Sequence, residues 1–354
     1  MASKKNKISS RIFLNLIATI FLAAVGIWGS HSIDKILQNP LSDNIEVWGF
    51  YILTICFVIF FTWLLYSRET YSLSAQKELI EKSDELEEII RTLPPEGFLD
   101  LFSEKYDEAH GVYKALLASD GQVTKQDIEL SIRGILLGIL RLTTYFDRAA
   151  EDHSYGANIM IFTDAYKEDK TFKPDLRENL KFVNDDVDLN KLKGLIYLKH
   201  ELSTNSKEDD SSMDDDLQKI LLALPVPNEA KSADTQKFRA LPGAPLAIAL
   251  NKSNVYANTE TLDEWVRTQG DFNKTIETQI KEYFCSGIGQ EIKSFCSFPL
   301  SCDDGEPIAV LNIHKNAINI LSGKDQFAMY IKIMCPFLSM LSELVNKLSD
   351  VKNK

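Results

Sequence analysis

The sequence predicts an α+β protein: two transmembrane helices followed by an antiparallel sheet flanked by helices. Three observations predict this fold class. Two apolar runs without a formal charge lie near the amino terminus, at residues 12–29 and 47–66. The spacing of apolar residues changes from helical to strand-like near Tyr155. Later in the chain, two strand-like runs flank the turn sequence at residues 303–306.

The run at residues 47–66 is the stronger of the two membrane signals. A helix rises about 1.5 Å per residue, so this run matches the roughly 30 Å hydrocarbon core of a bilayer. Aromatic side chains of the kind found at membrane interfaces lie near its ends, at Trp48, Trp63 and Tyr66. We therefore predict a transmembrane helix, with a buried core helix as the alternative.

The run at residues 12–29 follows a basic start. Its apolar part is longer than the roughly 7 to 15 residues of a signal peptide, which is the alternative interpretation. The loop between the two runs carries more acidic than basic residues, so the positive-inside rule predicts that both termini are cytoplasmic. Residues 1–66 are thus expected to form a hairpin of two helices in the inner membrane, with the lipid bilayer as partner.

The segment at residues 67–93 is expected to be a linker helix. Its leucines recur at a spacing of seven: Leu79, Leu86 and Leu93. This spacing is typical of a coiled coil, but Lys82 interrupts the second apolar row, and an ordinary amphipathic helix fits equally well. Pro94 and Pro95 end the helix, because proline lacks a backbone donor. Residues 95–354 are expected to form a cytosolic domain.

Within that domain, the periodicity predicts elements in a definite order. Helices are expected at residues 98–118, 125–150, 271–284 and 324–348, the last with Pro336 inside it. Strands are expected at residues 157–165, 193–202, 244–259, 291–302 and 307–315. The acidic, serine-rich segment at residues 203–216 is expected to be a solvated insert.

Composition and motifs exclude several classes of function. The net charge of −12 argues against binding to a nucleic acid polymer. The sequence contains no GxSxG, Walker or GxGxxG motif and no zinc protease pattern, so we expect neither an enzyme nor a cofactor or metal site. The four cysteines after residue 66 form no CxxC pair and are expected to be reduced thiols.

Several segments of the predicted domain resemble a GAF domain over about residues 125–348. They are ANIMIF at residues 157–162, SFCSFPLSCDDGEPIAVLNIH at residues 294–314, and the loop that follows. In that family the last strand often ends in a small residue, valine, leucine and asparagine, as at residues 309–312 here. The lysine expected next is Ile313, with Lys315 two places on, and the expected loop phenylalanine is Leu321. The lysine to aspartate bridge of the members that bind cyclic nucleotides is therefore not implied.

The resemblance implies a cavity on a curved sheet that buries a small molecule, here an anionic ligand or a nucleotide. The candidate wall residues are Asn158, Phe162, Arg239, Tyr256, Cys296, Phe298, Asn312 and His314. Arg239 is the candidate for pairing with phosphate, since its planar guanidinium matches such oxygens. For Phe162 and Phe298 the alternative is a place in the core, and for Arg239 and Tyr256 a place on the surface.

Two functions remain open from the sequence. The first is a sensor, expected to be a homo-oligomer, that signals through residues 67–93 to its membrane hairpin. This architecture resembles that of two-transmembrane effectors of bacterial antiphage systems, which disturb the bilayer. The alternative is a module without a ligand, held at the membrane for dimerisation or for docking a partner.

Overall fold

The structure is a computed structural model that describes residues 19–20, 22–27, 29–30, 33, 37, 45–119, 123–164, 178–183, 192–206, 220–287, 289–302, 304–321 and 324–352. The chain divides into two compact units, Met1–Ile89 and Ile90–Lys354. The second unit contains the sheet and its own hydrophobic cores.

Helix α2, Ile45–Thr92, joins the predicted span at residues 47–66 and the predicted linker into one continuous helix of 48 residues. Its segment Tyr51–Asp84 is long and apolar enough to cross a membrane, and none of its most apolar window is buried. Half of the residues in the predicted span 12–29 lie outside the described residues; those that are described there, such as 22–27, are helical.

A second described helix passes the same test of length and composition. It is Asp325–Val351 within α9, Lys324–Lys352, and 39% of its most apolar window is buried. The buried side chains of α9 belong to the main hydrophobic core of the second unit. Packing against the sheet therefore accounts for the apolar face of this helix.

The second unit is built on a six-stranded antiparallel sheet in the order β3-β2-β1-β6-β5-β4. The strands are β1, Tyr155–Asp164; β2, Leu192–Asn205; β3, Ile220–Pro227; β4, Asn254–Tyr256; β5, Ser294–Ser301; and β6, Pro307–Lys315. The predicted α+β class is confirmed, and so is the hairpin formed by β5 and β6.

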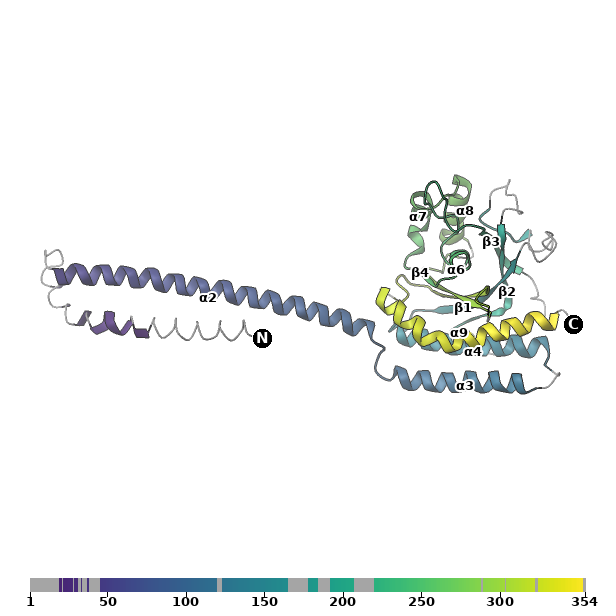
Figure 1. The fold of residues 1–354 in the computed structure, drawn as a ribbon, viewed down its shortest axis with the longest axis horizontal. Helices are drawn as coiled ribbons and strands as arrows, with labels where there is room; N and C mark the ends of the chain where they lie inside the picture. Colours follow the sequence, from purple (N-terminus) through teal and green to yellow (C-terminus); the bar gives the residue numbers. More distant parts are fainter. Residues whose placement is uncertain are drawn as a thin grey trace. The chain divides into compact units, whose positions relative to one another are not determined.

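Helices cover both faces of this sheet (Figure 1). One face packs against α4, Lys125–Phe146, and α9, and α3, Phe98–Ala118, lies on the outer side of these two helices. The other face packs against α6, Ala244–Leu250; α7, Leu262–Thr268; and α8, Lys274–Cys285, with the short helix η2, Thr259–Thr261, before α7. Strand residues alternate between the two faces, so the two cores share the same strands.

The prediction of a strand over residues 244–259 is wrong for its first half, which forms α6. In Ala244–Leu250 alanine alternates with larger apolar residues, which is the period of a strand, but alanine is the best helix former. Pro245 lies in the first turn, where a missing N–H costs nothing, and Asn251 ends the helix with a φ of 48°. Only β4 remains of the predicted strand.

Strand β3 was not predicted, and its sequence contains Pro225 and Pro227. Proline has no backbone N–H to donate to a neighbouring strand, which argues against a central strand. In the structure β3 lies at the edge of the sheet, where one side needs no partner. Residues 207–216 of the acidic insert lie outside the described residues, and residues 203–205 belong to β2.

The four predicted helices of this unit agree closely with the prediction, whereas η2 and α7 were not predicted. Helix α4 starts at a capping box between Thr124 and Asp127, and it ends at Phe146, four residues before the predicted end. Helix α9 continues through Pro336.

Candidate functional site

A cavity of about 500 Å³ lies between the sheet and the helices α6 and α8. Its floor comes from β1, β6 and β5, and its cover comes from the start of α6, from Leu262 and from the last turns of α8. It is large enough for a small organic molecule.

The register of the three strands arranges the floor in transverse rows. Asn158 of β1 pairs with Asn312 of β6, which pairs with Ser297 of β5. The row on one side consists of Gly156, His314 and Phe295, and the row on the other of Met160, Val310 and Pro299. A polar row therefore lies between an aromatic row and an apolar row.

The polar row is connected by hydrogen bonds. The Ser297 hydroxyl donates to Oδ1 of Asn312 over 2.7 Å, and Nδ2 of Asn312 donates to Oδ1 of Asn158 over 2.9 Å. These bonds fix the orientation of both amides. They direct the Nδ2 hydrogens of Asn158 away from Asn312.

His314 depends on the absence of a side chain at Gly156. A Cβ atom at position 156 would lie 2.3 Å from Nε2 of His314, so only glycine leaves room for the imidazole ring across the strand pair. Burial lowers the pKa of His314 to about 4. The imidazole is therefore neutral at physiological pH and offers one donor and one acceptor.

The cover is held against the floor by Asn254. Its side chain accepts from the backbone N–H of Gly243 and donates to the carbonyl of the same residue, over 2.9 and 3.0 Å. Phe295 stacks between Tyr256 and Phe284, with ring centroids 5.6 and 6.5 Å away. Aromatic rings thus wall one end of the cavity.

Three of the eight predicted wall residues line this cavity, and they are neighbours: Asn158, Asn312 and His314. Tyr256 lies behind the wall, stacked on Phe295. Phe162 belongs to the apolar cluster on the same face of the sheet, where the ammonium group of Lys193 lies 5.8 Å from its ring.

Cys296 and Phe298 lie on the opposite face of the sheet, so the prediction that they form the wall is wrong. Both are buried in the core beneath α4 and α9, because they alternate with Phe295 and Ser297 along β5. Burial raises the pKa of the Cys296 thiol well above its usual value. Cys296 and His314 point to opposite sides and cannot form a thiol and base pair.

Arg239 does not line the cavity. Its guanidinium is about half exposed and forms ion pairs with Glu229 over 3.4 Å and with Asp271 over 3.7 Å. Arg239 therefore lies at the surface, which was the alternative prediction, and not in the wall of the cavity.

Several floor residues were not predicted from the sequence, among them Gly156, Phe295 and Ser297. Gly156 lies two residues before the predicted wall residue Asn158 on β1 and therefore on the same face. Phe295 and Ser297 lie opposite His314 and Asn312, so finding them requires the register of β5 against β6.

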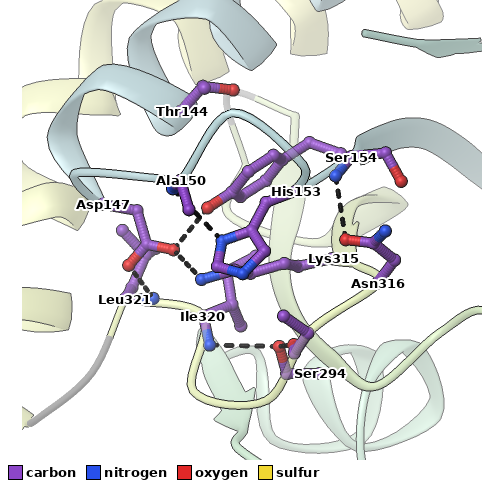
Figure 2. Close-up of polar contacts among 12 residues, drawn as sticks. Thr144, Asp147, Ala150, His153, Ser154, Ser294, Lys315, Asn316, Ile320 and Leu321 are labelled. Atoms are coloured by element: carbon purple, nitrogen blue, oxygen red, sulfur yellow. Dashed lines mark hydrogen bonds and ion pairs between the residues drawn. The ribbon is translucent and has the colours of Figure 1, made fainter. Parts of the chain in front are cut away.

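A buried charged cluster lies at the edge of the core between the sheet and the helices α4 and α9 (Figure 2). The ammonium group of Lys315 donates to Oδ2 of Asp147 over 2.9 Å, and both side chains are less than a tenth exposed. The hydroxyl of Tyr155 donates to the same oxygen over 2.6 Å, and the backbone N–H of Leu321 donates to Oδ1 over 2.8 Å. Burial, and next the charge of Asp147, raises the pKa of Tyr155.

This cluster joins four segments: the end of α4, the start of β1, the end of β6 and the loop before α9. Tyr155 and Lys315 directly neighbour Gly156 and His314 in sequence, so the cluster and the cavity share the same strand ends. Lys315 thus pairs with Asp147 of α4 and not with an acid of the final helix.

A second hollow, of about 910 Å³, lies beside the start of α3 and the second half of α4. Arg141, Tyr145 and Arg148 line it. Nη2 of Arg148 donates to the carbonyls of Ile90 and Leu93 over 3.2 and 3.5 Å, and the hydroxyl of Tyr145 donates to the carbonyl of Glu96 over 2.6 Å. Within the second unit, these bonds tie residues 90–96 to the end of α4. Among the described residues, no three His, Cys, Asp or Glu side chains gather to hold a metal ion.

No protein-family model and no curated protein matches the sequence. A solved structure described as "Structure of the GAF domain" is similar in fold, with a TM-score of 0.33 and 9% identity. The similarity covers 72% of this chain and 93% of that one. At this TM-score and identity, the similarity assigns neither a ligand nor a function.

Proposed function

We propose that this protein is a membrane-anchored sensor that binds a small molecule in the cavity between the sheet and helices α6 and α8. The observation that carries the proposal is the convergence of Asn158, Asn312, Ser297 and His314 in one cavity. Oriented amides beside aromatic rings are typical of ligand sites, in which a few polar groups orient a ligand among apolar walls.

The membrane part of the proposal rests on the sequence and on α2. The anchor is the hairpin of residues 1–66, with both termini on the cytoplasmic side of the cell membrane. The exposed apolar side chains of Tyr51–Asp84 support it, because such a surface is costly in water. Binding is signalled through residues 67–93 to the hairpin of several copies, and the output is a disturbance of the bilayer, as in a defence effector.

Thermal unfolding tests the sensor. The unit Ile90–Lys354 has its own cores, so it is suited to the measurement as a fragment. A ligand that binds only the native state at about 100 times its Kd adds about 2.7 kcal/mol, which raises the melting temperature by about 5 °C or more. The small-molecule extract of cells that make the protein should produce this rise.

Two serine variants serve as a matched pair. Ser297→Leu fills the floor of the cavity and should abolish the rise, whereas Ser301→Leu on the same strand lies outside the cavity lining and should retain it. An unchanged melting temperature of the wild type, together with capture of a protein partner, would instead favour the docking module.

The anchor has a separate test. Full-length protein should stay in the membrane pellet after alkaline carbonate washing. A tag at the carboxyl terminus should be protected from protease added to intact cells. Free solubility without detergent, or cleavage of the tag from outside, contradicts the proposed topology.

A further inference from the structure

The hydrogen bonds on the cavity floor have a direction, and this direction constrains the ligand. The chain of donors runs from Ser297 through Asn312 to Asn158. Its end is Nδ2 of Asn158, whose hydrogens are donated to no side chain or carbonyl of the described residues. A ligand above this residue is therefore met by an N–H donor, which pairs with a carbonyl oxygen or a ring nitrogen.

His314 supplies the complementary groups one row away. Asn312 and His314 are two residues apart on β6 and so lie on the same face. His314 lines the same cavity, and as a neutral imidazole it carries one N–H and one bare nitrogen. Donor and acceptor groups within one short segment match the edge of a heterocycle that carries both.

The shape of the walls favours a flat ligand. Phe295, Phe284 and Tyr283 contribute aromatic surface at one end, and Met160 and Leu224 contribute apolar surface elsewhere. Planar rings bury the most area against such walls.

Charge argues against an anion. The described lining of the cavity includes one acidic residue, Glu291, and no lysine or arginine, and the guanidinium of Arg239 pairs with Glu229 and Asp271 outside it. An anionic group in the cavity would therefore find no cation among the described lining residues to compensate its desolvation.

We propose that the cavity takes an uncharged, planar nitrogen heterocycle or cyclic amide, recognised by Asn158 and His314 and stacked beside Phe295. This inference rests on the proposed sensor function and narrows it, because the sequence alone favoured an anionic ligand.

Fractionation of the ligand source by charge tests the inference. The probe is the small-molecule extract of cells that make the protein, passed at neutral pH through a strong anion exchanger and then a strong cation exchanger. Each fraction is added to the full-length chain in lipid nanodiscs, and the melting temperature is measured. The fraction that neither exchanger retains should raise it.

Two variants sharpen the assay. Asn158→Leu removes the donor and should weaken the response to the unretained fraction about tenfold. Arg239→Gln should leave every response unchanged, because Arg239 lies outside the cavity lining.

The outcomes distinguish a failure of the uncharged ligand from a failure of the sensor function. Stabilising activity in either retained fraction, or loss of the response in Arg239→Gln, overturns the uncharged ligand and leaves the sensor intact. No response to the unfractionated extract overturns the sensor function and this inference with it.

Discussion

The two faces of the sheet differ sharply although they come from the same strands. On the face that packs against α4 and α9, the side chains of Ala157, Cys296 and Leu311 are at most 1% exposed and belong to the core. On the other face, their sequence neighbours form the floor of a cavity. Because successive residues of a strand point to opposite sides, a single short segment serves both stability and binding. Effects of substitution should therefore alternate along β1, β5 and β6.

The largest expected difference is between two neighbours on β5. Phe298→Ala empties a fully buried site and should reduce the free energy of unfolding by about 3–5 kcal/mol. Ser297→Ala removes one hydrogen bond on the cavity face and should cost about 1 kcal/mol. Urea unfolding of the unit Ile90–Lys354 measures both. Equal costs would show that the cavity face is as tightly packed as the core.

The buried charged cluster should be nearly as sensitive. Lys315→Met leaves Asp147 buried without its cation and should cost about 3–5 kcal/mol. Lys293→Met is the matched control, since Lys293 and Glu260 are 33% and 63% exposed and their pair should contribute less than about 1 kcal/mol. A small loss for Lys315→Met would mean that Tyr155 and Leu321 satisfy Asp147 unaided.

The free energy of unfolding should depend on pH through His314 on the cavity face. The pKa of His314 is about 4 in the folded protein and about 6.5 unfolded, so between these values the unfolded chain binds the proton first. The free energy of unfolding therefore falls as the pH decreases from about 6.5 to about 4, by at most about 3 kcal/mol, and this contribution is constant outside that window.

The difference between the pH profiles of the wild type and a His314 variant separates the contribution of this histidine from those of other titrating groups. His314→Gln keeps a neutral polar side chain and should remove this part of the pH dependence. Denaturant unfolding at several pH values provides the measurement. Parallel pH profiles for wild type and variant would mean that His314 is protonated as readily in the folded state as in the unfolded chain.

The smallest expected effect concerns the bonds of Arg148 to the start of the second unit. Arg148 follows Asp147 directly, and its bonds to the carbonyls of Ile90 and Leu93 are exposed. Arg148→Ala should change stability by less than about 1 kcal/mol but increase hydrogen exchange at residues 90–97. Arg141→Ala, in the same hollow without those bonds, should not. Equal exchange in both variants would argue against Arg148 as the link.

The sequence predicted the parts of the site that local patterns encode. Asn312 and His314 were found because they lie on a strand whose pattern is distinctive, and Asn158 because its strand is strongly apolar. Cys296 and Phe298 were predicted wrongly because they belong to the same hairpin. The hairpin pattern does not tell which of its two faces packs against α4 and α9 and which one lines the cavity.

Arg239 shows a different reason for failure. Its position beside a tight turn and its chemistry suited a phosphate, but its partners Glu229 and Asp271 are 10 and 32 positions away in sequence. Such a pair forms only when the chain folds back, so no local pattern predicts it.

The sequence by itself determined the long uncharged segments, the α+β class and the order of most elements, because helical and strand periods and the lengths of apolar runs are local properties. Only the tertiary structure decided which strand face became core and which became cavity, that β3 takes the edge, and that Lys315 meets Asp147. Those outcomes depend on register and on contacts between distant segments, where the free energy of burying whole faces selects one arrangement among several that the local sequence allows.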